Sequence, residues 1–381
     1  MGRTRRKRKR RPRNLLSPKW IGELYSWIQR LGFKPTSVLR LACTPASGRG
    51  IVCLSNIEAG DVIIDLPSTL LITPDLVRKE LNMSKENLSA EEILTIFVLS
   101  ERSLGEKSKW KPYIESIPDV FDGLQCRKSV RLPRRLAQAI DRWNAERRNV
   151  FSRLRMFFRG RGIDLNFETF SWAWSAVNTR CIYVEGHGST LAPFLDLLNH
   201  HWKASIETSF VNNHFIIRSN VGYEAGSEVF IGYGSHDNRT LFLNYGFVLD
   251  ENPNDCITVE LEHLEKLKRS RNIHEFARKI EFLRQNQKFT DQTGFTRDGA
   301  TWNLGIVIGV LQEDDEDIWT GYLTGEATAD KSDWCELLAR IMLEDYSLSV
   351  PDPMAQKLLE IEENILRSLI NGDAPRKTKE I

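Results

Sequence analysis

The stretch "TLAPFLDLLNHHW" (residues 190–202) is apolar over most of its length, yet an aspartate, an asparagine and two histidines interrupt it. A buried polar group without a hydrogen-bond partner costs roughly 1–3 kcal/mol. Asp196, Asn199 and His200 must therefore either satisfy one another within the core or face a cleft that holds a ligand. The rest of the sequence decides between these two interpretations.

The composition is that of an ordinary globular protein. The chain has 381 residues, 41% hydrophobic and 27% charged, which is enough for two domains with a sizeable core. No uninterrupted apolar run reaches the ~18 residues of a membrane span, so we expect no membrane association. Six scattered cysteines without a C-x-x-C pair argue against a disulfide framework and a structural zinc site. We expect a reduced, intracellular, metal-free protein, and a monomer, since nothing in the sequence argues for more.

Positive charge is concentrated at the start of the chain. The segment "MGRTRRKRKRRPR" (1–13) carries nine Lys or Arg and no acidic residue, which leaves 44 basic against 51 acidic residues elsewhere. Such a run is typical of nuclear-import signals and of tails that contact nucleic acid, although a merely solvated terminus has the same composition. We expect residues 1–16 to form a basic disordered arm that makes at most a weak nucleic-acid contact. The corresponding expectation for localisation is nucleus and cytoplasm.

Hydrophobic patterning predicts an α+β protein. A helix is expected within 17–33, and short runs rich in Val, Ile and Leu, such as "GIVCL" and "DVIIDL", follow it as strands. Helical patterns then dominate, strand-like runs return, and the last third of the chain is helical in pattern. The expected organisation is a β-rich catalytic unit over 17–250 with a helical insertion at about 73–165, an all-helical C-terminal domain over 258–372 and a tail over 373–381.

Two familiar kinds of ligand site are not supported by the sequence. "GHG" (186–188) and "GYG" (232–234) lack the third glycine and the strand–turn–helix setting of a dinucleotide-binding loop. A metal held by Asp196 with His200, His201 and His214 is disfavoured, because the adjacent residues His200 and His201 point in different directions on a strand or a helix.

Three segments, taken in order, are similar to those of SET-domain protein methyltransferases: "SGRG" (47–50), "NTR…LAPFLDLLNH" (178–200) and "EVFIGYGSHDNRTLFLNYGFV" (228–248). The segments "KWKPYIESIP" (109–118) and "WAWSAVNTR" (172–180) narrow the resemblance to the branch typified by the Rubisco large-subunit lysine methyltransferase. The resemblance implies small β-sheets, a pseudoknot that joins the second and third segments, a helical insertion and a C-terminal helical substrate-binding domain.

The resemblance also implies the chemistry. A SET enzyme transfers a methyl group from S-adenosyl-L-methionine to a nitrogen nucleophile of a protein substrate by in-line displacement. Holding donor and acceptor collinear can supply roughly 7–11 kcal/mol of the barrier. Desolvation and the nearby sulfonium charge lower the pKa of an entering lysine from its ordinary value of ~10.4, so that the amine can react in its neutral form.

Cofactor-binding roles follow for the matching residues. The main-chain groups of Ser47 and Arg49, in the tight turn with Gly48, are expected to grip the amino-acid end of the cofactor. Arg180 is the expected counter-charge for the methionyl carboxylate, through a bidentate geometry that lysine could not match. The remaining expected cofactor-binding residues are Asp196, Asn199, His200 and Tyr233.

Two tyrosines match the catalytic positions of the family. A phenol with a pKa of ~10 is a poor general base at neutral pH. We therefore expect the hydroxyl of Tyr233 to orient the nucleophile, by accepting from the amine or from the polarised methyl C–H groups. Tyr245 in "NYGFV" matches the second tyrosine that lines the site, and Phe247 is expected to pack beneath the channel.

The methyl acceptor stays open at this point. The basic arm favours histones or other nuclear proteins, a ribosomal protein is an alternative, and one relative in this branch prefers a histidine. A SET fold kept as an interaction module without turnover is the non-enzymatic alternative, and the matching residues at Arg180, Asn199, His200, Tyr233 and Tyr245 count against it. The number of methyl groups added depends on the volume and water of the lysine channel, which the sequence does not give.

Overall fold

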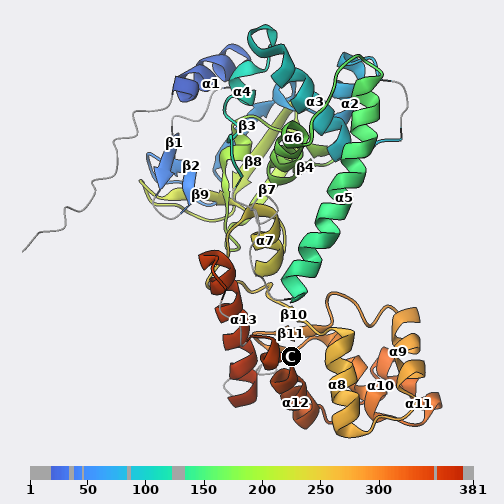
Figure 1. Cartoon of the computed structure of the whole chain (residues 1–381). Coiled ribbons are helices and arrows are strands. Elements are labelled where there is room, and N and C mark those ends of the chain that lie inside the picture. The colour runs from blue at the N-terminus through green and yellow to red at the C-terminus, as the bar shows by residue number, and fades with distance from the viewer. Residues whose placement is uncertain are drawn as a thin grey trace, which may run out of the picture. The chain divides into compact units, whose positions relative to one another are not determined.

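The computed structural model describes residues 19–33, 38–44, 47–83, 87–121, 134–346 and 350–371. The expected basic arm (1–16) and tail (373–381) lie outside these residues. The chain divides into two compact units, shown with their elements in Figure 1. The first unit comprises Met1–Phe121 and Asn149–Tyr233, and the second comprises Asp122–Arg148 and Gly234–Ile381.

The first unit is built on small sheets. Its strands are β1 (Leu39–Thr44), β2 (Gly48–Cys53), β3 (Val62–Pro67), β4 (Ile182–Val184), β5 (Gly188–Thr190), β6 (Asn199–His200), β7 (Ile206–Val211), β8 (His214–Ser219) and β9 (Glu228–Ile231). They form sheets in the orders β1-β2-β9-β6, β3-β8-β7 and β4-β5. β2 begins at Gly48, whose φ of +73° is a left-handed conformation that glycine adopts without a steric penalty.

The parallel pairing of β6 with β9 brings the two polar segments together. Asn199 pairs with Phe230 and His200 with Ile231, although about thirty residues separate the strands. The antiparallel pairing of β2 with β9 then sets the "SGRG" turn beside the same strand. This confirms the juxtaposition that the predicted pseudoknot required.

Helices surround these sheets in the first unit. They are α1 (Lys19–Arg30), α2 (Pro74–Glu80), α3 (Ala90–Leu104), α4 (Lys111–Ile114) and α6 (Phe167–Arg180), with short 3-10 turns η1 (Ser68–Leu70), η2 (Gly105–Lys107) and η4 (Leu195–Leu197). The long helix α5 (Arg134–Arg159) begins in the second unit and ends in the first. Ser89 and Glu92 form the capping box of α3, in which each side chain bonds to the backbone N–H of the other.

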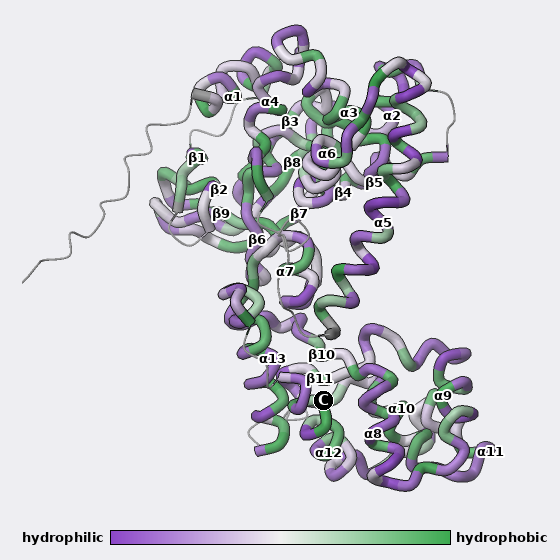
Figure 2. Tube along the Cα trace, in the orientation of Figure 1, coloured by the Kyte–Doolittle hydropathy of each residue, from purple (hydrophilic) through white to green (hydrophobic). Residues whose placement is uncertain are grey.

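The second unit is mostly helical. It contains α7 (Asn238–Tyr245), α8 (Leu261–Arg271), α9 (Phe276–Gln285), α10 (Trp302–Gln312), α11 (Glu316–Thr324), α12 (Ser332–Leu343), η5 (Glu344–Tyr346) and α13 (Pro353–Asn371). Hydrophilic and hydrophobic residues alternate along α5 and α13 (Figure 2), as expected for helices with one buried face. In the described part of the chain, no helix is both long and apolar enough to cross a membrane.

One expectation for this region needs correction. The C-terminal domain is not all-helical, because β10 (Ile257–Thr258), β11 (Gly294–Thr296) and β12 (Gly299–Ala300) form a three-stranded sheet. These strands are two or three residues long, too short for a period-two pattern to show in the sequence. The division between the two compact units falls after Tyr233, and Phe242 of α7 shares one buried cluster with Leu358 of α13. The expected domain bounds stay a prediction.

Candidate functional site

A carboxylate at the start of β9 joins the "SGRG" turn to β6. Oε2 of Glu228 accepts from the hydroxyl of Ser47 at 2.5 Å, and Oε1 accepts from Nδ2 of Asn199 at 2.7 Å. The same Nδ2 donates to the carbonyl oxygen of Arg49 at 2.8 Å. A side-chain amide has two hydrogens to donate, so both are used to hold three strands together. The side chain of Asn199 can therefore meet a ligand only through its oxygen.

Gly50 makes this close packing sterically possible. A Cβ atom built on Gly50 would lie 2.7 Å from Nδ2 of Asn199 and closer still to Oε1 of Glu228. Both distances are shorter than real Cβ contacts. The backbone φ of Gly50 is not in the left-handed region. Glycine is therefore needed here to leave space for the two side chains, not for its backbone conformation.

A buried acidic group lies next to the hydrogen-bonded group of Ser47, Glu228 and Asn199. The side chain of Asp196, on η4, has 0% exposure, and its Oδ2 accepts from the hydroxyl of Tyr113 at 2.9 Å. Nη1 of Arg180 lies 3.3 Å from the same oxygen and donates to the carbonyl oxygen of Asp196 at 3.0 Å. Burial raises the pKa of the Asp196 carboxyl, while the Arg180 charge and the Tyr113 hydroxyl oppose that shift.

Two polar atoms of the Arg180–Asp196 pair are not used in these bonds. Oδ1 of Asp196 and Nε of Arg180 are buried and have no hydrogen-bond partner among the described residues. Most buried polar atoms in folded proteins are paired, so such atoms call for an explanation. A ligand that carries both an acceptor and a donor would satisfy them.

Arg49 adds a second guanidinium to the same region. Its Nη1 donates to the carbonyl oxygen of Ser116 at 3.1 Å, and its guanidinium carbon lies 5.2 Å from the ring centroid of Trp20. Burial lowers the pKa of Arg49, and the charge of Arg180 lowers it further. The charges of Asp196 and Asp119 oppose this shift, so Arg49 adds a second positive charge near the Arg180–Asp196 pair, where an anionic group would be attracted.

Tyr233 is fixed from both its backbone and its side chain. Its N–H donates to Nδ1 of His200 at 3.0 Å, and its hydroxyl donates to the carbonyl oxygen of Leu198 at 2.9 Å. Since Nδ1 accepts, this bonding pattern assigns His200 as the neutral tautomer protonated at Nε2. The rings of His200 and Tyr233 lie 5.3 Å apart. Because the hydroxyl proton of Tyr233 is already used in the hydrogen bond to Leu198, its oxygen can only accept a hydrogen bond from any further group.

The first unit therefore brings most of the predicted residues into one region. These are Ser47, Gly48, Arg49, Arg180, Asp196, Asn199, His200 and Tyr233. Tyr245 ends α7 in the second unit, where its ring lies 6.2 Å from those of His236 and Phe247. Its place beside Tyr233 stays a prediction.

Two residues of this region did not stand out in the sequence. Glu228 opens "EVFIGYG", and Tyr113 lies within "KWKPYIESIP", both segments that carried the family resemblance. The only local signal is a charged group at the start of an apolar strand and an aromatic hydroxyl in a short helical turn. Their partners are 29 and 83 residues away in the chain, for Asn199 and Asp196 respectively, so no local pattern could reveal the contacts.

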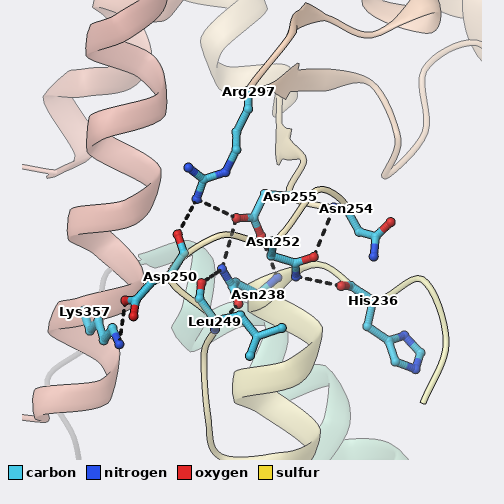
Figure 3. Close-up of polar contacts among 9 residues, drawn as sticks. All are labelled: His236, Asn238, Leu249, Asp250, Asn252, Asn254, Asp255, Arg297 and Lys357. Atoms are coloured by element: carbon cyan, nitrogen blue, oxygen red, sulfur yellow. Dashed lines mark hydrogen bonds and ion pairs between the residues drawn. The ribbon is translucent and has the colours of Figure 1, made fainter. Parts of the chain in front are cut away.

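A separate polar cluster, drawn in Figure 3, holds the start of α7 in the second unit. Asn238 donates its backbone N–H to Oδ1 of Asp255 at 2.9 Å, and it exchanges two side-chain bonds of 2.7 Å with the backbone of Leu249. Nη2 of Arg297 donates to the carbonyl oxygen of Asp250 at 2.8 Å. Burial raises the pKa of Asp255 to about 6. These bonds join α7, the loop after it and the β11–β12 hairpin, which is a structural role.

Comparisons with known proteins agree with this geometry. A family model described as SET domain matches residues 48–234. SET domain-containing protein 4 of Homo sapiens is 30% identical over 379 residues, which cover 92% of this chain and 85% of that protein. A ribosomal lysine N-methyltransferase of Schizosaccharomyces pombe is 25% identical over 287 residues, covering 72% of this chain and 68% of that protein.

Solved structures show the same fold. The SET domain of LSMT bound to lysine and AdoHcy matches with a TM-score of 0.70 and 18% sequence identity. The match covers 94% of this chain and 91% of that chain.

Proposed function

Because this chain belongs to the SET-domain family of protein methyltransferases, we propose that it is an S-adenosyl-L-methionine-dependent protein-lysine N-methyltransferase. One observation carries the proposal. The buried Arg180–Asp196 pair, with one donor and one acceptor left over, lies in the same unit as the fixed hydroxyl of Tyr233. The first feature suits the charged end of the cofactor, and the second suits a reacting amine.

The residues present fit the cofactor. Its amino-acid end carries a carboxylate and an ammonium group, which match the two leftover atoms in chemistry. Nε of Arg180 would donate to the carboxylate, and the nearby positive charge of Arg49 would add to the attraction. Oδ1 of Asp196 would accept from the ammonium group. Ser47, Gly48, Asn199 and His200 would complete the cofactor site as their family positions imply.

The side chains would promote methyl transfer mainly by positioning. When bound, the cofactor supplies a methyl group activated by its sulfonium. Tyr233 would accept a hydrogen bond from the incoming amine, because its own proton is already given to Leu198, and would so align the nitrogen lone pair. By the family resemblance, Tyr245 would be the second tyrosine that lines the lysine channel. Desolvation of the entering lysine would lower its pKa, so that it reacts as the neutral amine.

For the acceptor, we propose a lysine of a histone or another nuclear protein, with the enzyme present in nucleus and cytoplasm. The nine basic residues within 1–13 support this, as a nuclear-import signal or a weak nucleic-acid contact. A ribosomal protein is the alternative, and the relative from Schizosaccharomyces pombe, described as a ribosomal lysine N-methyltransferase, supports it.

The test uses purified full-length protein and labelled S-adenosylmethionine, with an extract from cells that lack the enzyme. The labelled bands are digested, and the modified residue is identified by mass spectrometry, with Tyr233→Phe as the control. Label on lysine that is lost in the variant would support the proposal, and the identity of the band would choose between nuclear and ribosomal substrates.

Two other outcomes would change the proposal. Label on histidine would keep the fold and overturn the assignment of the acceptor. Binding of the cofactor without label in any fraction would favour a SET fold that serves as an interaction module.

A further inference from the structure

We propose that Tyr113 is a positioning residue that keeps Asp196 and Arg180 open for the amino-acid end of the cofactor. The inference rests on the proposed function, because that function assigns this pair to the cofactor. Tyr113 belongs to α4, within the helical insertion, and reaches Asp196 across 83 residues of chain.

The hydroxyl of Tyr113 is held rigidly. Its side chain has 0% exposure, and its backbone N–H donates to the carbonyl oxygen of Trp110 at 2.9 Å. The hydroxyl of Ser116 donates to the carbonyl oxygen of Tyr113 at 2.6 Å, which closes the turn from the other side. Burial raises the pKa of the phenol well above its usual value, so it stays a hydrogen-bond donor at neutral pH.

This donor determines how the two carboxylate oxygens of Asp196 are used. Oδ2 is shared by the hydroxyl of Tyr113 and by Nη1 of Arg180, while Oδ1 has no partner. A guanidinium and a carboxylate left to themselves prefer a bidentate pair with two parallel N–H···O bonds. Such a pair would use Oδ1 of Asp196 and a second nitrogen of Arg180. By anchoring Oδ2, Tyr113 prevents that closure and leaves both atoms for a ligand.

Tyr113 also helps to keep Asp196 ionised. The groups that face Asp196 are Arg180 from α6, Arg49 from β2 and Tyr113 from α4, with the buried thiol of Cys181 nearby. Burial raises the pKa of Asp196, and the two arginines and the phenol oppose the shift. Loss of the hydroxyl therefore raises the pKa further, and Asp196 becomes protonated at a higher pH than in the wild type.

The experiment compares two ligands in Tyr113→Phe. S-adenosylhomocysteine carries the amino-acid end, whereas 5′-methylthioadenosine has the same nucleoside and thioether but lacks that end. We expect the variant to bind S-adenosylhomocysteine about tenfold or more weakly, the loss of about 1.4 kcal/mol or more that one hydrogen bond to a charged group contributes. Its affinity for 5′-methylthioadenosine, measured by competition, should be unchanged. The loss for S-adenosylhomocysteine should grow as the pH falls.

Tyr183→Phe is the matched control. It makes the same chemical change in the same unit, on a tyrosine with 78% exposure, and should bind both ligands as the wild type does. Equal loss of affinity for both ligands in Tyr113→Phe would show a general structural role and overturn the proposal.

A double-mutant cycle tests whether Tyr113 acts through Asp196. In the Asp196→Asn background, adding Tyr113→Phe should not weaken S-adenosylhomocysteine binding further. A further tenfold loss would overturn the proposal. This comparison also holds if Tyr113→Phe alone fails to fold, because Asp196→Asn removes the buried charge that the lost hydroxyl leaves poorly paired. A wild-type protein that binds neither ligand would instead refute the proposed function.

Discussion

The hydroxyl of Tyr233 donates a hydrogen bond to the carbonyl oxygen of Leu198 across 2.9 Å. Leu198 directly precedes the Asn199–His200 strand, so this bond connects the tyrosine after β9 to the strand with which β9 pairs. The orientation of the phenol is therefore set by the β6–β9 pairing itself. A ligand that approaches the oxygen meets a lone pair whose direction is already fixed.

Tyr233→Phe should lower kcat by about 10²-fold or more, because the amine loses the group that aligns it. The KM for S-adenosylmethionine should change by less than about threefold, since the phenyl ring and the backbone bond to His200 remain. Steady-state kinetics with a protein substrate would measure both values. Tyr223→Phe, which removes a hydroxyl bonded to the backbone of Phe230 on the same sheet, should leave kcat unchanged. An unchanged kcat in Tyr233→Phe would contradict the orienting role.

Glu228→Gln should destabilise the first unit by on the order of 1 kcal/mol. The amide that replaces one carboxylate oxygen cannot accept from both Ser47 and Asn199, so one of these donors loses its partner. The unfolding midpoint should fall by about 2–4 °C, and the affinity for S-adenosylhomocysteine should fall with it. Glu207→Gln, on the exposed strand β7, should change neither quantity. Wild-type affinity in Glu228→Gln would mean that the hydrogen bonds of Glu228 to Ser47 and Asn199 do not shape the cofactor site.

Gly50→Ala should have a larger effect than the loss of one hydrogen bond. The added Cβ would displace the carboxylate of Glu228 and the amide of Asn199 together. We expect a loss of cofactor affinity of about tenfold or more, with destabilisation of roughly 1–3 kcal/mol as in other overpacked sites. Isothermal titration with S-adenosylhomocysteine and thermal unfolding would measure the two effects.

The matched control for this change is Gly22→Ala. No atom lies within 4 Å of the position of its Cβ, and Gly22 is in helix α1, where alanine is favoured over glycine by about 1 kcal/mol. This variant should be slightly more stable than the wild type and should bind the cofactor normally. If both alanine variants behaved alike, steric crowding at Gly50 would not be the explanation.

The residues expected at the site came from a family resemblance of short segments. The resemblance of "NTR", "LNH" and "GYG" pointed to Arg180, Asn199, His200 and Tyr233; the structure brings these residues together in the first unit, and their roles stay predictions. The helical insertion and the short strands also followed from hydrophobic patterning. These features depend on local order along the chain, which a single sequence contains.

The contacts that hold the site were not predictable, because they join distant segments. Glu228 and Tyr113 were visible only as residue types, and their partners depend on the parallel β6–β9 pairing and on the packing of α4. The small sheet β10–β12 was not expected because strands of two or three residues carry no periodic signal. Asn199, which is expected to bind the cofactor, uses the two hydrogens of its side-chain amide to join strands, so its side-chain oxygen and its main chain are what it can offer a ligand.

The polar cluster that starts α7 should give the second unit an unusual dependence on pH. The pKa of Asp255 is raised by burial from 3.8 to about 6 in the folded protein (Figure 3). The folded state therefore binds this proton more tightly than the unfolded chain does. Its contribution to stability is greatest below pH 3.8, falls as the pH rises towards 6, and is constant above that. The total change over this range is about 3 kcal/mol.

Asp255→Asn removes the titratable carboxyl group. The substituted residue must still accept hydrogen bonds from the backbone N–H and the side-chain amide of Asn238. The variant should be less stable than the wild type, and the difference should be larger at pH 4 than at pH 7, because the wild type alone gains from protonation. Thermal unfolding at half-unit steps from pH 4 to pH 8 would measure the difference. Asp291→Asn, an exposed aspartate of the same unit, serves as the control and should show a small difference that does not follow this pattern. A difference that grew as the pH rose would mean that Asp255 is held ionised in the folded protein, with Arg297, whose Nη2 lies 3.5 Å from its Oδ2, outweighing burial.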